Sequence, residues 1–314
     1  MEPRLLNTTT LTFELPLQIH QEEAASEHSS KRPYVILSHC WASNNDHEVK
    51  YDDIISGWKR QKPGFPKVEG TARQARKEGL DWIWIDTCCI DKRSSAETTE
   101  AINSMYRWYE EADRCYVYLQ DVGPGSDISF RQSRWFKRGW TLQELIAPAV
   151  VEFFDSEWTH LGSKETRANE ISECTGIHVE VLLDRKIKEY SIAQKMSWAA
   201  DRETTKSEDR AYCLLGLFNI NMVPIYGEGE RAFIRLQEEL IRNSDDHTIF
   251  AWSMDPTKYR LSGLLAPSHR HFKDCSSAKA LNRWKGQCHM EFHPRPSRSP
   301  GTRWHLAVEV RPSP

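Results

Sequence analysis

An acid and an indole stand four residues apart in the segment RGWTLQEL, residues 138–145. Glu144 follows Trp140 by about one helical turn, so the two side chains share a face if this segment is a helix. The spacing by itself favours a tryptophan in the core and a glutamate in water. The alternative is a pocket in which an aromatic wall and a carboxylate face the same ligand, with Arg138 close to the start of the helix.

More polar side chains stand where apolar runs of the sequence end. Ser38, His39 and Trp41 follow the run at 34–37, Asp86 and Asp91 follow the run at 81–85, and Asp121 follows the run at 115–119. Ligands of an open parallel sheet bind beyond the carboxyl ends of its strands. These side chains are therefore predicted to border one crevice together with Glu144.

Apolar runs alternate with helical patterns in the first half of the chain. Strands are predicted at 34–37, 81–86, 115–119 and 150–154, and helices at 71–78, 97–112 and within 131–147. Strands that alternate with helices form βαβ units and a parallel sheet. The sequence therefore predicts an α/β fold in which helices flank a parallel sheet.

The pattern changes after about residue 160. Helices are predicted at 191–200, 207–218 and 227–243, and late strands at 247–252 and 304–310. We therefore divide the chain into an α/β core (1–160), a helical extension (161–254) and a C-terminal extension that is β or irregular (255–314).

The composition excludes several classes of protein. The 314 residues include 42 Lys and Arg against 45 Asp and Glu, so no basic excess indicates nucleic-acid binding. No window approaches 18 apolar residues, and the first residues lack the apolar core of a signal peptide, so no membrane association is expected. Several of the eight cysteines lie in apolar runs and none forms a C-x-x-C pair, which predicts a reducing, cytoplasmic location without structural zinc.

Other chemistries find weaker support in the sequence. No phosphate-binding P-loop occurs, and the glycines of GEGERA, residues 227–232, are interpreted as a helix start because their glutamates would repel a pyrophosphate. Cys40 beside His39 suggests a thiol nucleophile, but neighbours in a strand point to opposite faces. Asp86 and Asp91 could pair on a metal, although an Asp at a strand end more often caps a turn.

Three segments resemble the hallmark blocks of the fungal heterokaryon incompatibility (HET) domain: YVILSHCW, WIWIDTCCID and RGWTLQEL, in this order. SEDRAYCLLGLF and MVPIYGEGERAFIRLQEELI are also similar to it, so the resemblance covers roughly residues 34–243. HET domains are regarded as distant relatives of the Toll/interleukin-receptor (TIR) domain. The resemblance implies a TIR- or flavodoxin-like parallel sheet, to which the mainly helical C-terminal half is added.

The resemblance also implies a site. In enzymatic TIR domains the glutamate of a W-C-x-x-E-L block is needed to cleave NAD at the nicotinamide–ribose bond. Trp140 and Glu144 occupy the Trp and Glu places, and Thr141 stands in place of the Cys. Glu144 is then the catalytic residue, NAD is a substrate and not a bound cofactor, no metal is required, and the substrate-binding residues are Ser38, His39, Trp41, Asp86, Asp91, Arg138 and Trp140.

The residues suit that chemistry. Cleavage passes through an oxocarbenium-like state and nicotinamide leaves as a neutral molecule, so one carboxylate that stabilises positive charge is enough. Trp140 or Trp41 can stack on the pyridinium, and Arg138 can hold phosphate oxygens. The leading hypothesis is a cell-death effector, an NAD nucleosidase that acts as a homo-oligomer, because TIR-like enzymes tend to complete their pockets across subunits. An upstream sensor protein would be its partner.

One departure keeps a second hypothesis open. The first strand has Tyr34 and Val35 where TIR domains carry an acid. The alternative is a non-catalytic signalling module that self-associates. A hydrolase that uses Cys40 or Cys88 is a third reading.

Overall fold

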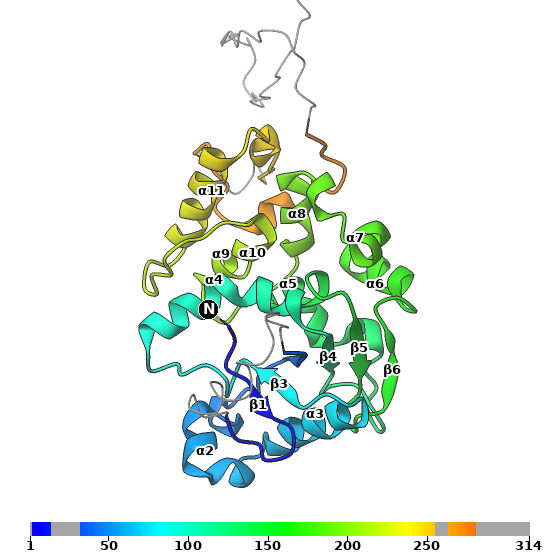
Figure 1. Ribbon diagram of the computed structural model, residues 1–314. Helices are drawn as coiled ribbons and strands as arrows, with labels where there is room; N and C mark the ends of the chain where they lie inside the picture. The colour runs from blue at the N-terminus through cyan, green and yellow to red at the C-terminus, as the bar shows by residue number, and fades with distance from the viewer. Residues whose placement is uncertain (1, 14–31, 255–262, 281–314) are drawn as a thin grey trace, which may run out of the picture. The chain divides into compact units, whose positions relative to one another are not determined.

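The computed structural model describes residues 2–13, 32–254 and 263–280. Within these ranges six strands form one sheet in the order β1-β3-β2-β4-β5-β6 (Figure 1). The strands are β1 (Leu6–Asn7), β2 (Val35–His39), β3 (Trp82–Ile85), β4 (Arg114–Tyr118), β5 (Val151–Phe154) and β6 (His160–Ser163).

The four central strands of this sheet are parallel, and the two edge strands are antiparallel. The predicted α/β fold is confirmed, but the sheet is mixed where an entirely parallel one was expected. β6 runs antiparallel because only residues 155–159 separate it from β5, a connection too short for a crossover. All five residues of β2 are buried, as expected for a central strand that is covered on both faces.

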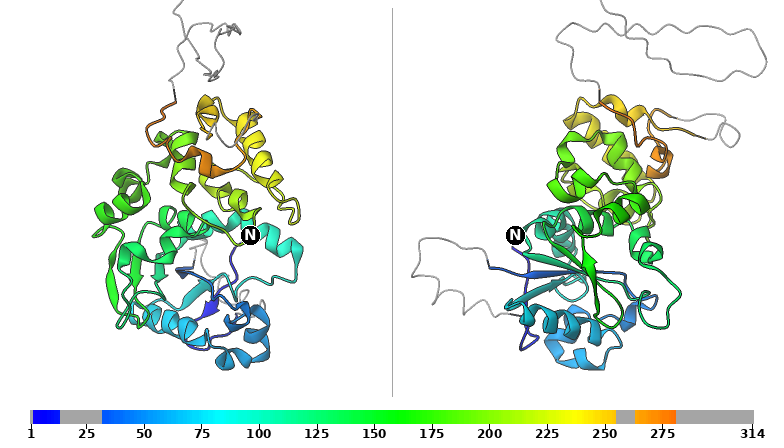
Figure 2. Two further views of the ribbon diagram at one scale, coloured as in Figure 1. Left: turned by 180° about the vertical axis from the view of Figure 1, so that it is seen from behind. Right: turned by 90° about the vertical axis from the view of Figure 1, so that its right-hand side faces the viewer.

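Helices cover both faces of the sheet (Figures 1 and 2). α3 (Phe65–Lys77) lies on one face, and α4 (Ser95–Glu111) and α5 (Thr141–Ile146) lie on the other. The remaining labelled helices are α2 (Tyr51–Ser56), α6 (Ala168–Thr175), α7 (Val179–Asp184), α8 (Ile192–Ala199), α9 (Asp209–Tyr212), α10 (Leu215–Phe218) and α11 (Arg231–Asn243).

Local sequence signals explain the two long crossover helices. Ser94 caps α4 by accepting a hydrogen bond from the amide of Glu97, and the helix buries an apolar face that includes Ile102, Met105 and Tyr109. α3 begins earlier than predicted, with Pro66 in its first turn. It runs through Gly70, where a Cβ atom would lie only 2.1 Å from the indole nitrogen of Trp158. Glycine is therefore used at this position for a close contact and does not end the helix.

The helical part of the chain packs on the α4 and α5 layer, through contacts of α10 with α4 and of α7 with α5. The sheet itself extends to Ser163, just past the boundary predicted at residue 160. The strand predicted at 247–252 is wrong, because residues His247–Phe250 form a 3-10 helix that Asp246 caps by accepting a hydrogen bond from the Thr248 amide. The strand predicted at 304–310, and all of 255–314 except 263–280, lie outside the described residues. Within the described ranges, every helix is too short or too polar to span a bilayer.

Candidate functional site

The strand order has a switch point at β2. The crossover from β2 through α3 leads to β3 on one side, and the chain then returns through α4 to β4 on the other side. Crevices at such points, beyond the carboxyl ends of the strands, are where open α/β sheets bind ligands. Ser38 and His39 are the last two residues of β2, and they point to opposite faces of the sheet.

On the α5 face, Ser38 meets Glu144. The Ser38 hydroxyl donates a hydrogen bond to Glu144 Oε2, and Trp135 Nε1 donates to Ser38 Oγ at 2.7 Å. Glu144 is 6% exposed, and Ser38 and Trp135 are fully buried. The glutamate therefore does not lie in water, as the spacing alone had favoured, but in a hydrogen-bonded group at the end of the central strand.

The electrostatics of this carboxyl follow from its burial. The pKa of Glu144 is raised from 4.5 to about 8: loss of solvation is the main cause and the nearby Asp86 adds to it, while the Ser38 hydroxyl and Arg138 oppose the rise. The carboxyl is therefore mostly protonated at neutral pH. Its pKa is close enough to neutrality for a proton to be released when a cation approaches, which is suitable for charge stabilisation or acid–base work.

On the opposite face, His39 lies between two acids. Its Nε2 is 3.9 Å from Glu48 Oε2, and its Nδ1 is 4.0 Å from Asp86 Oδ1. Glu48 is in turn paired with Lys67 of α3, with nitrogen–oxygen distances of 2.6 and 2.8 Å, and both side chains are buried. Burial and the neighbouring Lys67, Arg138 and Lys92 lower the pKa of His39 well below 6.5, so its imidazole is neutral.

Trp41 forms the outer rim of these groups. Its indole nitrogen donates to Asp86 Oδ2 at 2.8 Å, and its ring is half-buried. Lys92 Nζ lies 3.7 Å from the centre of the ring, and Arg138 Cζ lies 6.0 Å from it. Two cations thus flank an aromatic face close to the ends of β2 and β3.

Some buried polar atoms at these strand ends are without a hydrogen-bond partner among the described residues. They are His39 Nε2, Asp86 Oδ1 and Thr87 Oγ1. Unpartnered buried polar atoms are rare in folded proteins because each carries a desolvation cost. Their grouping beside Trp41 makes this edge of the sheet the candidate ligand site.

Other predicted residues lie elsewhere or have structural partners. Trp140, the indole expected beside Glu144, lies within hydrogen-bonding reach of Asp209; burial raises the pKa of that carboxyl, and the Trp140 indole opposes the rise. Asp91 is occupied by Arg93, which donates to both of its oxygens at 2.9 and 2.8 Å. Asp121 ties the loop after β4 to the segment of Trp135 by accepting from the Ser133 hydroxyl at 2.7 Å.

The thiol and phosphate-loop readings are disfavoured by local structure. Burial raises the pKa of Cys40 to about 11, so it holds no appreciable thiolate at neutral pH. The amides of Gly227 and Gly229 donate to one oxygen of Glu208, at 2.7 and 3.1 Å. These bonds help to lower the pKa of Glu208 to about 2, so the loop already holds an anion of its own. Among the described residues, no group of three or more His, Cys, Asp or Glu is arranged to hold a metal ion.

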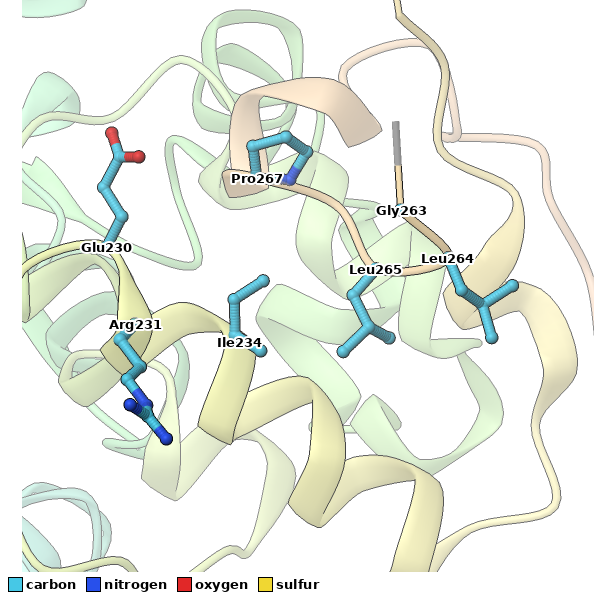
Figure 3. A pocket seen from close by; sticks show the side chains of 7 residues that line it. All are labelled: Glu230, Arg231, Ile234, Gly263, Leu264, Leu265 and Pro267. Atoms are coloured by element: carbon cyan, nitrogen blue, oxygen red, sulfur yellow. The ribbon is translucent and has the colours of Figure 1, made fainter. Parts of the chain in front are cut away.

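Two cavities lie outside the Glu144 group. The larger, about 490 Å³, lies between α11 and residues 263–267 and is lined mainly by apolar side chains such as Ile234 and Leu265 (Figure 3). It lacks the convergent polar groups that a nucleotide requires. The smaller, about 120 Å³, is bordered by Glu48, Lys67 and Tyr118 at the ends of β2 and β4. Glu144 lines neither of these two cavities, and with 6% of the residue exposed its carboxyl is closed off in this conformation.

Sequence reasoning missed Trp135, Glu48 and Lys67, which hold Ser38 and surround His39. Trp135 lies six residues before Thr141, in a 3-10 helix (Arg134–Lys137) and not on the helix of Glu144. A pattern of helical spacing could not find it. Glu48 and Lys67 are 19 residues apart and pair only in the folded chain.

Similarity to a known family covers the part of the chain that forms β2, β3 and β4. Residues 34–131 match the family described as heterokaryon incompatibility protein (HET), a range that includes Ser38, His39, Trp41 and Asp86. The chain is 44% identical over 218 residues to Vegetative incompatibility protein HET-E-1 of Podospora anserina. The chain carries a heterokaryon incompatibility domain.

The match to HET-E-1 covers 66% of this chain and 16% of that relative, so the HET domain protein described here spans only a small part of it. Residues 231–298 match a domain of unknown function, DUF8212, which begins at α11. No solved structure matches the chain at a significant level. The predicted family membership is confirmed, and the predicted relation to TIR domains stays a prediction.

Proposed function

We propose that this HET domain acts in heterokaryon incompatibility as a cell-death effector, and that it does so by hydrolysing NAD at the nicotinamide–ribose bond. Glu144 is the essential acid of this reaction. The observation that carries the proposal is the buried Ser38–Glu144 hydrogen bond at the end of β2, together with the unpartnered polar atoms of His39, Asp86 and Thr87 at the ends of β2 and β3. The name of the relative HET-E-1 supports the role in incompatibility.

Each residue of the site has a separate role in this reaction. Trp41 offers its ring to the pyridinium, and Lys92 and Arg138 on either side of it bind the phosphate oxygens. Ionised Glu144 stabilises the positive charge that develops on the ribose as nicotinamide leaves. Water then adds to the ribose carbon, and the proton it loses balances the reaction.

The raised pKa of Glu144 supports control by assembly. In the closed subunit the carboxyl is protonated, out of reach, and unable to stabilise a cation. A bound pyridinium would lower its pKa, because an opposite charge within a few ångströms favours the ionised form. We propose that self-association opens the Trp41 rim so that substrate reaches the carboxyl, which makes activity depend on protein concentration.

The test is nicotinamide release by the purified chain, measured across a wide range of protein concentration. We expect release per subunit to rise steeply with concentration, and Glu144→Ala to abolish it. Glu238→Ala, on the exposed side of α11, is the matched control and should behave like wild type. Equal release by Glu144→Ala and wild type would refute the assignment.

A second function is favoured by the closed state of the carboxyl. If the domain is a non-catalytic module that self-associates, Glu144 is a buried structural acid. Its signature is concentration-dependent oligomers that kill cells equally well with Glu144→Gln, without nicotinamide release. The two functions are therefore separated by one variant in two assays.

A further inference from the structure

A buried arginine joins the helical part of the chain to the helix that carries Glu144. Arg202 follows α8 and is 3% exposed. Its Nη1 donates to the Arg138 carbonyl oxygen at 3.0 Å and to Thr141 Oγ1 at 2.9 Å, and its Nε donates to the Trp198 carbonyl oxygen at 3.2 Å. Two of these hydrogen bonds link Arg202 to the start of α5, and the third holds it to α8.

Thr141 is the centre of this link. Its hydroxyl lies 2.6 Å from the Trp135 carbonyl oxygen and 2.9 Å from that of Arg138, while its oxygen accepts from Arg202. Trp135 is the residue that holds Ser38, and Glu144 lies one turn beyond Thr141. One hydroxyl therefore connects Arg202 to both sides of the Ser38–Glu144 bond.

The backbone reinforces the same junction. The Gly139 amide donates to the Glu203 carbonyl oxygen at 2.7 Å, and the Glu203 amide donates to the Lys137 carbonyl oxygen at 2.6 Å. A Cβ atom on Gly139 would lie 2.5 Å from the Thr204 side chain, so glycine is what permits this approach. His269, within the DUF8212 match, reaches the Arg202 carbonyl oxygen through its Nε2 at 3.2 Å.

The guanidinium group of Arg202 is buried without a partner of opposite charge in the part of the chain that the structure describes. Its Nη2 has no hydrogen-bond partner among the described residues, and its other side-chain hydrogen bonds go to two carbonyl oxygens and a hydroxyl, none of which carries a charge. An unpaired buried cation is costly and is retained where its geometry or charge is used. Burial lowers the pKa of Arg202 to about 10.

We propose that Arg202 is the positioning residue for Glu144. Its hydrogen bonds to Thr141 and Arg138 fix the start of α5, so that the position of the C-terminal helical part determines the position of the acid. The inference rests on the proposed function only in the activity measurement, and the hydrogen-exchange measurement is independent of it. This role of Arg202 makes the region after α8 part of the site, although Ser38, which donates a hydrogen bond to the carboxyl, comes from the sheet.

The experiment uses the full chain with Arg202→Met, Arg202→Lys and, as the control, Lys273→Met. Lys273 is exposed and pairs with Asp201, next to Arg202 in sequence. Hydrogen exchange of peptides covering 138–147 is measured by mass spectrometry. We expect exchange there to be about tenfold faster in Arg202→Met, because hydrogen bonds to a charged group are lost, partly recovered in Arg202→Lys, and unchanged in Lys273→Met.

Nicotinamide release gives the second readout. In Arg202→Met we expect kcat to fall about tenfold and KM to rise by less, because Glu144 is displaced while Trp41 and Lys92, which bind substrate without contacting Arg202, stay in place. Unaltered exchange over 138–147 in Arg202→Met overturns the inference. If Arg202→Met does not fold, Thr141→Val is used in its place. Exchange over 138–147 that is as slow in Thr141→Val as in wild type likewise overturns the inference. If the wild-type chain releases no nicotinamide but the Arg202 variant exchanges faster over 138–147, the positioning role of Arg202 stands and only the proposed reaction is refuted.

Discussion

Replacing Glu144 by glutamine should remove a pH-dependent loss of stability. In the folded chain the pKa of Glu144 is about 8 instead of 4.5, because the carboxyl is buried beside Ser38. Below pH 4.5 the carboxyl is protonated in both the folded and the unfolded chain, so it contributes nothing to the pH dependence. As pH rises from 4.5 to 8 the unfolded chain releases this proton and the folded chain keeps it, so stability falls. Above pH 8 the loss is complete.

The size of the effect follows from the shift. At 1.36 kcal/mol for each unit, the shift costs the wild type roughly 5 kcal/mol above pH 8 and roughly 3 kcal/mol at pH 7. Glutamine has nearly the same shape, accepts the Ser38 hydrogen bond and does not ionise. Glu144→Gln should therefore be more stable than wild type near neutral pH, by an amount that grows with pH.

Urea unfolding of both proteins at intervals from pH 4.5 to 8.5 measures this difference. The unfolding free energy of each protein depends on pH through all of its titrating groups, but the difference between the two proteins reports the contribution of Glu144. Glu238→Gln, exposed on α11, controls for the general effect of removing one acid. A stability difference between wild type and Glu144→Gln that stays flat across this range would refute the assignment of a buried, protonated carboxyl.

Two further predictions concern the scaffold around the site. Lys67→Met leaves Glu48 as an unpaired charge in the interior and should cost roughly 3–5 kcal/mol of unfolding free energy, whereas the double variant with Glu48→Gln should recover much of that loss in the same urea assay. Gly70→Ala forces a methyl group against the Trp158 indole and should lower stability by about 1–3 kcal/mol, seen as a lower melting temperature. In a Trp158→Ala background the same Gly70→Ala change should be neutral or stabilising, and a full cost there would contradict the packing argument.

The apolar runs of the sequence were enough to predict the framework. Runs of four or five apolar residues fit only buried strands when helical patterns separate them, so the four central strands lie where they were predicted. The apolar stripe from Ile102 to Tyr109 likewise predicted α4, because its period is that of a helix. The strand ends then indicated Ser38, His39 and Asp86 as neighbours, since parallel strands bring their carboxyl ends to one edge.

Tertiary packing alone decided which groups touch. Helical spacing suggested Trp140 as the partner of Glu144. In the folded chain Gly139 packs against residues 203–204, and the indole of the next residue, Trp140, lies within hydrogen-bonding reach of Asp209. Trp135 takes the place beside Ser38 from a separate 3-10 helix. The state of the Glu144 carboxyl was equally beyond sequence reasoning, because desolvation depends on all the atoms that surround a group. Periodicity reports which face of an element is apolar, whereas the charge of a buried acid is decided by residues far away in the chain.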